Sequence, residues 1–240
     1  MVIVMKKILK LFSSGNVCVF GLRGRGKDML MSNVVVRRSL PYVSNVDYGG
    51  SYFPLNMDEF DCGGNTYDNF IHGTIKPYKY PYADGVDIYI SDVGVYFPAQ
   101  YCNELNKKYG HFSTFMALSR QLGECNVHFN VQNLNRAWDK IREQSDLYIC
   151  CNWCKIYFGK YVLQKVTLYE KYESACNRVP PYRNPNVRLN SDRKLQVALS
   201  KQNYRISHGD IKPLILFYKN KSSYNTRIFK DMMQPASDPE

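Results

Sequence analysis

One eight-residue segment constrains the fold of this chain more than any other. It follows an apolar, β-branched run at residues 16–20 and precedes a stretch with helical spacing of apolar residues at 27–38. The segment reads Gly21, Leu22, Arg23, Gly24, Arg25, Gly26, Lys27 and Asp28. A strand that turns through glycines into a helix is the opening unit of an α/β fold, so we expect a sheet with helices packed on it.

The same segment matches the spacing G-x-x-x-x-G-K, which suits the binding of nucleotide phosphates. Glycines let the backbone curl so that successive N–H groups point at phosphate oxygens, and the following helix adds its N-terminal dipole. Lys27 can then reach the β and γ phosphates. The segment therefore predicts a P-loop for ATP or GTP, and no base-specificity motif chooses between them. The alternative is a glycine-rich turn without a ligand, which the flanking strand and helix disfavour.

Asp28 departs from the usual pattern, in which Ser or Thr follows the lysine. The usual hydroxyl binds Mg²⁺, and a carboxylate is also an oxygen ligand that Mg²⁺ accepts. A carboxylate would also repel the phosphates, and Ser32, one turn further on, is no obvious replacement. We therefore expect Asp28 to be a metal ligand, with nucleotide binding better supported than fast hydrolysis.

A second acidic position follows the predicted strand at 86–90. Asp92 lies at its carboxyl end, where open α/β sheets bind ligands, so we expect a metal-binding and catalytic role. Two assignments remain open. Either Asp92 is the metal-side acid and Val93 replaces the catalytic Glu, or Ser91 replaces the metal-side Asp and Asp92 is the catalytic acid. A strand-end Asp that only caps the next turn is the alternative to both.

Three further polar residues are candidates for the same reaction. Gln132 ends the predicted strand at 127–131 and could contact the γ-phosphate or the attacking water. Arg142 could act within its own subunit or as an arginine finger in a neighbouring one, and Arg120 is a weaker candidate. For each arginine alone, a surface salt bridge is the default role.

Hydrophobic periodicity extends the pattern along the chain. Further strands are expected at 41–46 and 146–151, and helices at 99–108, 113–121 and 138–144, with a short helix near 55–60. This alternation predicts a P-loop NTPase fold with a mostly parallel, doubly wound sheet. A β-hairpin is expected between 155 and 172 around Phe158, Gly159 and Lys160.

Composition shifts divide the chain into three parts. Residues 1–14 form a basic arm or short amphipathic helix, and 15–176 form the P-loop ATPase domain. Residues 177–240, which begin with a Pro- and Asn-rich stretch, form a small β-containing basic extension. The last seventy residues hold thirteen basic and six acidic side chains, and the whole chain carries a formal net charge of +11. This charge suits a nucleic acid or an anionic lipid surface, and a solvated basic face is the plain alternative.

The cysteines and the hydropathy bear on location. No stretch approaches the roughly 20 apolar residues of a membrane span, and lysines interrupt the apolar N-terminal residues, so no signal peptide is expected. We therefore expect a reducing, cytoplasmic-side location with thiols rather than disulfides. Cys150, Cys151 and Cys154 have no second Cys pair or His pair beside them, which favours buried thiols over a zinc site.

The order of motifs resembles a known family over residues 14–155. An acidic strand end leads into Tyr96, Phe97 and Pro98, a helix ends in Ser119-Arg120-Gln121-Leu122-Gly123, the next strand ends in Gln132, and Ile141 and Arg142 follow. This order is similar to that of the zonular-occludens-toxin-like family. That family includes the assembly ATPase of filamentous phages and belongs to the wider FtsK/HerA group of DNA-pumping ATPases.

The resemblance implies an ATP- and Mg²⁺-dependent protein of phage morphogenesis at the host inner membrane. It implies single- or double-stranded DNA, a homo-oligomeric ring, and other assembly or coat proteins as partners. Family members usually carry a membrane segment after the ATPase domain, and none is evident here. We therefore expect a protein of the host cytoplasm that contacts the membrane, if at all, peripherally through residues 1–12 or the basic extension. The alternative is an ATP-binding assembly or scaffold protein with little or no hydrolysis, which Asp28 and the incomplete acidic pair favour.

A DNA-translocating protein would need a path for its substrate. The basic, tyrosine-bearing extension could follow a phosphate backbone while its aromatic rings stack on bases. The residues concerned are Tyr182, Arg183, Arg188, Arg193, Lys194, Tyr204 and Arg205.

Overall fold

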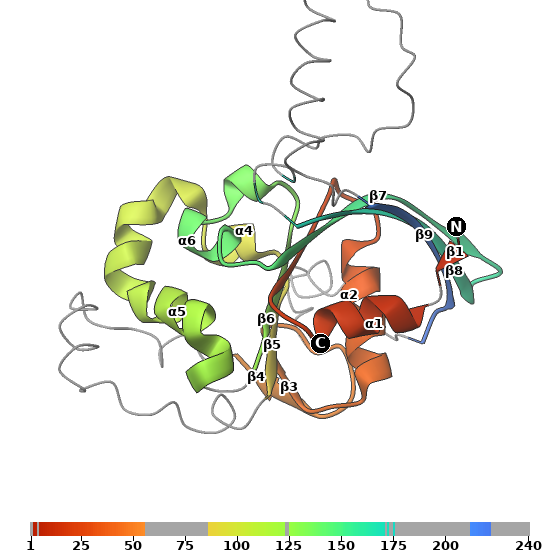
Figure 1. The fold of residues 1–240 in the computed structure, drawn as a ribbon, viewed down its shortest axis with the longest axis horizontal. Helices are drawn as coiled ribbons and strands as arrows, with labels where there is room; N and C mark the ends of the chain where they lie inside the picture. The colour runs from red at the N-terminus through yellow and green to blue at the C-terminus, as the bar shows by residue number, and fades with distance from the viewer. Residues whose placement is uncertain are drawn as a thin grey trace, which may run out of the picture.

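The computed structural model describes residues 2–3, 5–55, 86–122, 125–170, 172, 175 and 212–221. These residues form a nine-stranded sheet with helices on both faces (Figure 1). The strands are β1 (Val2–Ile3), β2 (Val17–Phe20), β3 (Tyr42–Ser44), β4 (Tyr52–Pro54), β5 (Asp87–Ile90), β6 (Val127–Val131), β7 (Leu147–Tyr157), β8 (Tyr161–Tyr169) and β9 (Lys212–Lys219). The helices are α1 (Met5–Phe12), α2 (Lys27–Arg38), α4 (Val93–Tyr96), α5 (Cys102–Leu122) and α6 (Asp139–Arg142), with short 3-10 turns at Ala99–Tyr101 and Leu134–Arg136.

The strand order is β1-β9-β8-β7-β2-β6-β5-β3-β4. From β4 to β7 every neighbouring pair is parallel, β8 is antiparallel to both β7 and β9, and β1 is parallel to β9. Helices α1 and α2 cover one face of the sheet, and α5 and α6 cover the other (Figure 1). The prediction of a mostly parallel, doubly wound sheet is thereby confirmed.

The central strand β2 explains where the site lies. All four of its side chains are buried, because helices cover both faces of the sheet there, and its sequence is accordingly a continuous apolar run. Phe20 at its end is level with Val131 of β6 and Cys150 of β7. Since β2, β5 and β6 are parallel, their carboxyl ends meet at one edge of the sheet, and the glycine segment begins there.

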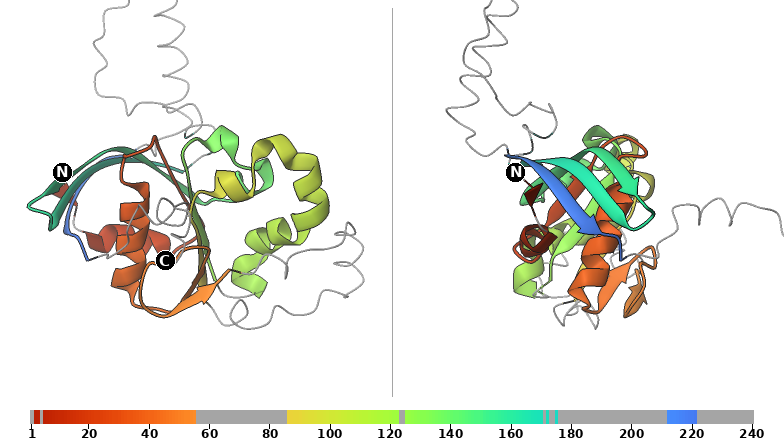
Figure 2. Two further views of the ribbon diagram at one scale, coloured as in Figure 1. Left: turned by 180° about the vertical axis from the view of Figure 1, so that it is seen from behind. Right: turned by 90° about the vertical axis from the view of Figure 1, so that its right-hand side faces the viewer.

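The hairpin of β7 and β8 was also expected from the sequence. Its turn contains Phe158 and Gly159 with φ angles of 49° and 62°, which suit a tight turn between twisted strands. The N–H of Lys160 donates to the carbonyl of Tyr157 at 3.1 Å. Figure 2 shows β9 lying alongside the hairpin as the next strand of the sheet.

Several local expectations need correction. The helices expected at 99–108 and 113–121 correspond to the two parts of α5, which meet at a kink at Tyr109 with φ and ψ of −120° and 24°, but residues Ala99–Tyr101 form a 3-10 turn instead of α-helix. The short strands β1 and β4 were not expected. The helix expected near residues 55–60 and the tyrosine- and arginine-bearing part of the extension lie outside the described residues.

Both ends of the chain contribute to the sheet and its core. Helix α1 buries Met5, Ile8 and Phe12 in the same cluster as the apolar side of α2, so its apolar face is occupied within the protein. Strand β9 pairs with β8 across the expected boundary at residue 176, and the three-part division of the chain remains a prediction. Among the described helices, none combines the length and the apolar character needed to cross a membrane.

Candidate functional site

The glycine segment forms a loop between β2 and α2. Gly24 and Gly26 have φ angles of 75° and 81°, a region that suits glycine. Gly26 is the N-cap of α2 and supplies no side-chain acceptor, so the first N–H groups of the helix have no cap from that residue. Free N–H groups with the helix dipole behind them suit an anion at this point.

The side chain of Lys27 fits the same purpose. The residue is only 5% exposed, and no hydrogen bond or ion pair to its ammonium group is found among the residues that the structure describes. A buried cation without a partner is costly, so the site favours an added anion. Lys27 also acts electrostatically on Asp92, which places the predicted lysine and the predicted acid in one site. The residues present therefore fit a nucleotide phosphate.

Asp28 contacts the neighbouring strand ends directly. Its Oδ1 accepts a hydrogen bond from Oγ of Ser91 at 3.2 Å and from Nδ2 of Asn130 at 2.8 Å. Asn130 lies on β6, between β2 and the strand β5 that leads to Ser91, and is completely buried. Two neutral donors thus hold the carboxylate at the foot of the phosphate loop.

Asp92 completes the acidic part of the site. It adopts a left-handed conformation with φ of 49°, and its N–H donates to Oδ1 of Asn130 at 2.8 Å. Burial raises the pKa of Asp92, the nearby charge of Asp28 raises it further, and Lys27 opposes the shift. The charge of Asp28 thus disfavours ionisation of Asp92, and a divalent cation between the two carboxylates would relieve this, so Asp28 and Asp92 could hold Mg²⁺.

A second asparagine fixes the backbone of the acidic strand end. Nδ2 of Asn45 donates to the carbonyl of Ser91 at 3.0 Å, and the N–H of Ser91 donates to Oδ1 of Asn45 at 2.8 Å. Neither Asn45 nor Asn130 was predicted from the sequence. For Asn130, the available signal was a polar amide near the end of a predicted strand, where parallel sheets bind ligands.

The back of the loop rests on the hairpin. Nε2 of Gln164 donates to the carbonyls of Gly26 at 3.0 Å and Arg25 at 3.2 Å, and Oε1 of Gln164 accepts from the hydroxyl of Tyr218 at 3.0 Å. Gln164 is fully buried. Sequence reasoning missed it because the contact depends on β8 lying two strands from β2.

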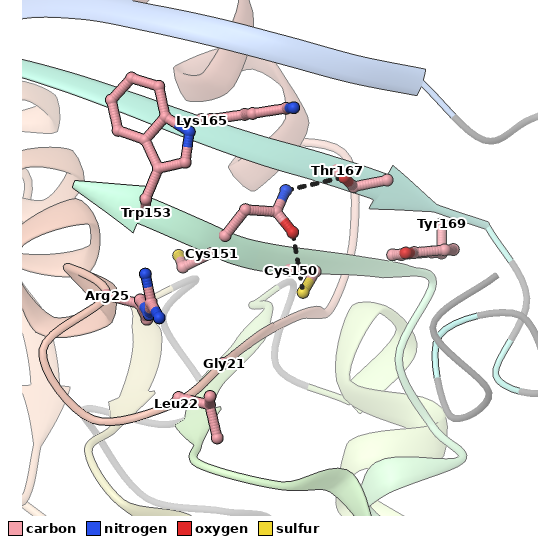
Figure 3. Close-up of a pocket in the computed structure, with 10 residues that line it drawn as sticks. Gly21, Leu22, Arg25, Cys150, Cys151, Trp153, Lys165, Thr167 and Tyr169 are labelled. Atoms are coloured by element: carbon pink, nitrogen blue, oxygen red, sulfur yellow. Dashed lines mark hydrogen bonds between the residues drawn. The ribbon is translucent and has the colours of Figure 1, made fainter. Parts of the chain in front are cut away.

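A pocket of about 310 Å³ opens beside the loop, on the β7 side of β2. Gly21, Leu22 and Arg25 line it from the loop, and residues of β7 and β8 line it from the hairpin (Figure 3). Two of the latter, Trp153 and Lys165, are paired across the two strands. The pocket is therefore a space that the phosphate loop shares with the hairpin.

The other sequence candidates are placed as follows. Gln132 follows β6 directly and is exposed. Arg142 is half-buried, donates through Nη1 to the carbonyl of Ala137 at 3.5 Å, and lies 5.2 Å from the ring centre of Tyr172. These contacts engage Arg142 with its own subunit, and its role in a neighbour's site remains a prediction.

Arg120 is part of α5, and its side chain is outside the described part. Oγ of Ser32 donates to the carbonyl of Met29 at 3.1 Å within α2.

The cysteine cluster is described at all three positions. Cys150 and Cys151 are buried, Cys154 is half-buried, and all three are free thiols. Burial raises the pKa of the Cys151 thiol, which keeps it protonated and neutral. Over the described ranges, no group of three or more His, Cys, Asp or Glu side chains is arranged to hold a metal ion.

The geometry defines the class of fold. A glycine loop joins a central parallel strand to a helix, and the acidic strand end lies beside it at the carboxyl edge of the sheet. The chain therefore has an α/β fold of the P-loop NTPase class.

Comparisons with known proteins give only distant similarities. No protein-family model and no curated protein matches the sequence. Among solved structures, the chain is similar to the N-terminal domain of zonular occludens toxin from Neisseria meningitidis, with 12% identity over 90% of this chain and 97% of that one and a TM-score of 0.43. It is also similar to the genome-packaging NTPase B204 from Sulfolobus turreted icosahedral virus 2 in complex with AMP, with 15% identity over 57% of this chain and 75% of that one and a TM-score of 0.37.

A third similar structure is that of EssC ATPases 2 and 3 from Geobacillus thermodenitrificans. It shares 11% identity over 82% of this chain and 44% of that one, with a TM-score of 0.41. The Neisseria domain bears the name of the family that the order of motifs resembles. At these TM-scores, the likeness is too weak to carry a conclusion about what this chain binds or does.

Proposed function

We propose that this chain is an ATPase that binds ATP with Mg²⁺ and couples its hydrolysis to DNA packaging, DNA extrusion or virion assembly. The observation that carries the nucleotide part is Lys27, a buried cation that leads α2 behind a glycine loop and acts electrostatically on Asp92. The DNA part is supported by the net charge of +11 and by the order of motifs in the sequence.

Each group of residues in the site has a separate role in this proposal. The backbone N–H groups of the loop and the ammonium of Lys27 bind the phosphates. Asp28, hydrogen-bonded to Ser91, would hold Mg²⁺, and Asp92 beside it would be the catalytic acid. When bound, the ion neutralises charge on the phosphate oxygens. The amides of Asn130 and Gln164 position the carboxylates and the loop.

The contact between Asp28 and Ser91 supports one of the two assignments left open by the sequence. In P-loop NTPases the loop supplies a hydroxyl and the acidic strand a carboxylate. Here the loop supplies the carboxylate and the strand supplies the hydroxyl, at 3.2 Å from each other. We assign Ser91 to the metal-side position and Asp92 to the catalytic acid, with the hydroxyl and the carboxylate exchanged between the two elements.

A reciprocal exchange tests this assignment. Asp28→Ser removes the carboxylate, and Ser91→Asp places a second carboxylate against Asp28, so each change alone should weaken Mg²⁺-dependent nucleotide binding by roughly tenfold. The double variant restores one hydroxyl and one carboxylate, and should recover most of the affinity. The measurement is titration with a fluorescent ATP analogue, with and without Mg²⁺. Additive losses in the double variant would contradict the exchange, since coupled neighbours are non-additive.

Turnover tests the function as a whole. ATP hydrolysis by the purified chain is measured with and without single-stranded DNA, beside a Lys27→Ala variant. We expect turnover that rises with DNA and is lost in the variant. Nucleotide binding without turnover would instead favour an ATP-binding assembly or scaffold protein. An absence of nucleotide binding would contradict the proposal altogether.

The finer setting belongs to the same proposal. We expect a homo-oligomeric ring on the cytoplasmic side of the host inner membrane, in which Arg142 reaches a neighbouring site and Gln132 contacts the γ-phosphate or the attacking water. Arg142→Ala should then lower turnover while leaving nucleotide affinity nearly unchanged. Mixing this variant with a Lys27→Ala variant should restore part of the turnover if the arginine acts between subunits.

A further inference from the structure

The sheet has a second face at its antiparallel end. The register of β7 shifts between Cys151 and Trp153, and beyond this bulge the hairpin and β9 curve away from the parallel strands (Figure 1). Helices α1 and α2 lie on the concave side of this part of the sheet, while α4, α5 and α6 lie toward its other end. The convex side has no described helix packed on it in either figure.

Strand register shows which side chains share this convex side. Directly paired residues of antiparallel strands point to the same face, and alternate residues along each strand do so too. The intervening residues Val162, Gln164 and Leu216 are fully buried on the concave side. The remaining residues form three rows across β7, β8 and β9, which we call the outer face: Trp153, Lys165 and Ile215; Lys155, Leu163 and Phe217; Tyr157, Tyr161 and Lys219.

The outer face combines aromatic rings with positive charge. Tyr157, Tyr161 and Phe217 are 42%, 40% and 46% exposed, although large aromatic side chains are usually more buried. The rings of Tyr161 and Phe217 stack with centroids 5.7 Å apart and planes within 7°. Three of the nine residues are lysines and none is acidic. At the tip of the hairpin, Phe158 is 92% exposed.

We propose that the outer face binds single-stranded nucleic acid, with bases stacked on its aromatic rings and phosphates paired with its lysines. The proposal deepens the proposed function, on which it rests, by naming the surface that meets the nucleic acid. Stacking on exposed aromatic side chains requires unpaired bases, so a single strand fits and a duplex does not. Each row holds one lysine and at least one aromatic ring, and lysines and rings interspersed in this way suit a chain of alternating bases and phosphates. The same residues suit a membrane less, because inserting the rings into the apolar layer would bring the charged lysines toward that layer as well.

A single residue of β8, Gln164, connects the outer face to the phosphate loop. Gln164 lies between Leu163 and Lys165 of the outer face, and its own side chain donates to the carbonyl of Gly26. The pocket beside the loop is lined by Trp153 and Lys165 on one side and Arg25 on the other (Figure 3). A shift of the loop on phosphate binding would therefore act on β8 directly, and through it on the outer face.

The experiment measures binding of a fluorescein-labelled oligothymidine by polarisation, without nucleotide and at several salt concentrations. Tyr161→Ala and Phe217→Ala should each weaken binding by roughly tenfold without changing the salt dependence. Lys155→Ala and Lys219→Ala should each lower the slope of log K against log salt by about 0.7. Tyr101→Ala and Lys140→Ala change equally exposed residues of the same types elsewhere, and should bind like the unchanged protein.

Three results would overturn the proposal. The first is that the outer-face variants bind the oligonucleotide as well as the two control variants do. The second is that the unchanged protein does not bind the oligonucleotide. The third is that the protein binds anionic phospholipid vesicles instead of the oligonucleotide and loses this binding in Phe158→Ala. Nucleotide affinity measured on the same variants keeps this test separate from the proposed function. Loss of oligonucleotide binding with unchanged nucleotide affinity supports the outer face, even if no turnover is found.

Discussion

At the scale of single residues, Gly26 is packed closely against the hairpin while Gly24 in the same loop is open. A Cβ atom at this glycine would lie 2.8 Å from Cβ of Cys154 and 3.0 Å from Nε2 of Gln164, whereas at Gly24 it would meet nothing within 4 Å. Both glycines have positive φ, so alanine at either should cost about 1 kcal/mol of stability. Gly26→Ala should cost about 1–3 kcal/mol more because of overlap with the hairpin. Urea unfolding of the two variants tests this, and equal losses would show that the hairpin yields.

A buried histidine sets a pH dependence at the same scale. His128 is fully buried between the rings of Phe12 and Tyr89, and burial lowers its pKa although Asp87 opposes the shift. The unfolded chain therefore takes up the proton first. The free energy of unfolding should therefore keep its full value above about pH 6.5. As the pH falls below 6.5, it should decrease by at most about 1.4 kcal/mol per pH unit. Denaturant unfolding between pH 7.5 and 5.5 measures the slope. His128→Asn should flatten it, and an unchanged slope would assign the loss to other groups.

Its neighbour Asp87 titrates in a different range. Burial alone would raise the pKa of Asp87, but His128 and the ion pair with Arg38 outweigh burial and lower it. Stability from this carboxylate is therefore present above its ordinary pKa of about 4 and lost only at more acidic pH. Asp87→Asn removes one partner of a largely buried ion pair and should cost about 3 kcal/mol at neutral pH. A loss under 1 kcal/mol in urea unfolding would show that Arg38 finds another partner or reaches water.

At the scale of elements, α1 decides whether the N-terminal arm is a structural helix or a membrane anchor. Ile8 is fully buried against the core that α2 shares, while Lys7 on the same helix is exposed. Ile8→Ala should cost about 2–5 kcal/mol of unfolding free energy, and Lys7→Ala within about 0.5 kcal/mol. Urea unfolding measures both. Similar small effects would mean that α1 contributes little to the folded core and is available for a surface.

At the scale of the whole molecule, β9 ties the C-terminal part of the chain to the sheet. It buries Leu214, Leu216 and Tyr218 beside α1 and α2 and covers the edge of β8. A chain ending at residue 200 should lose this core and expose a strand edge, so we expect loss of cooperative unfolding and aggregation. A chain ending at residue 221 keeps β9 and is the matched control. Equal stability of the two would support residues 177–240 as a separate extension.

The sequence by itself determined the local features of this protein. The bounds of α2 and β6, the tight turn at Phe158 and Gly159, and the loop from Gly21 to Asp28 follow from short-range rules. Glycine spacing, apolar periodicity and turn chemistry act over a few residues, so a single sequence displays them. The expected position of Asp92 at a strand end followed in the same way.

Only the tertiary structure decided which side chains meet. Asn130 contacts Asp28 because β6 lies between β2 and β5, and Gln164 reaches Gly26 because the hairpin folds beside β2. The exchange of Asp28 with Ser91 and the rows of the outer face likewise depend on strand order and register. Strand order and register depend on contacts between residues far apart in the chain. The packing of the whole core, rather than any local sequence pattern, determines which of these contacts form.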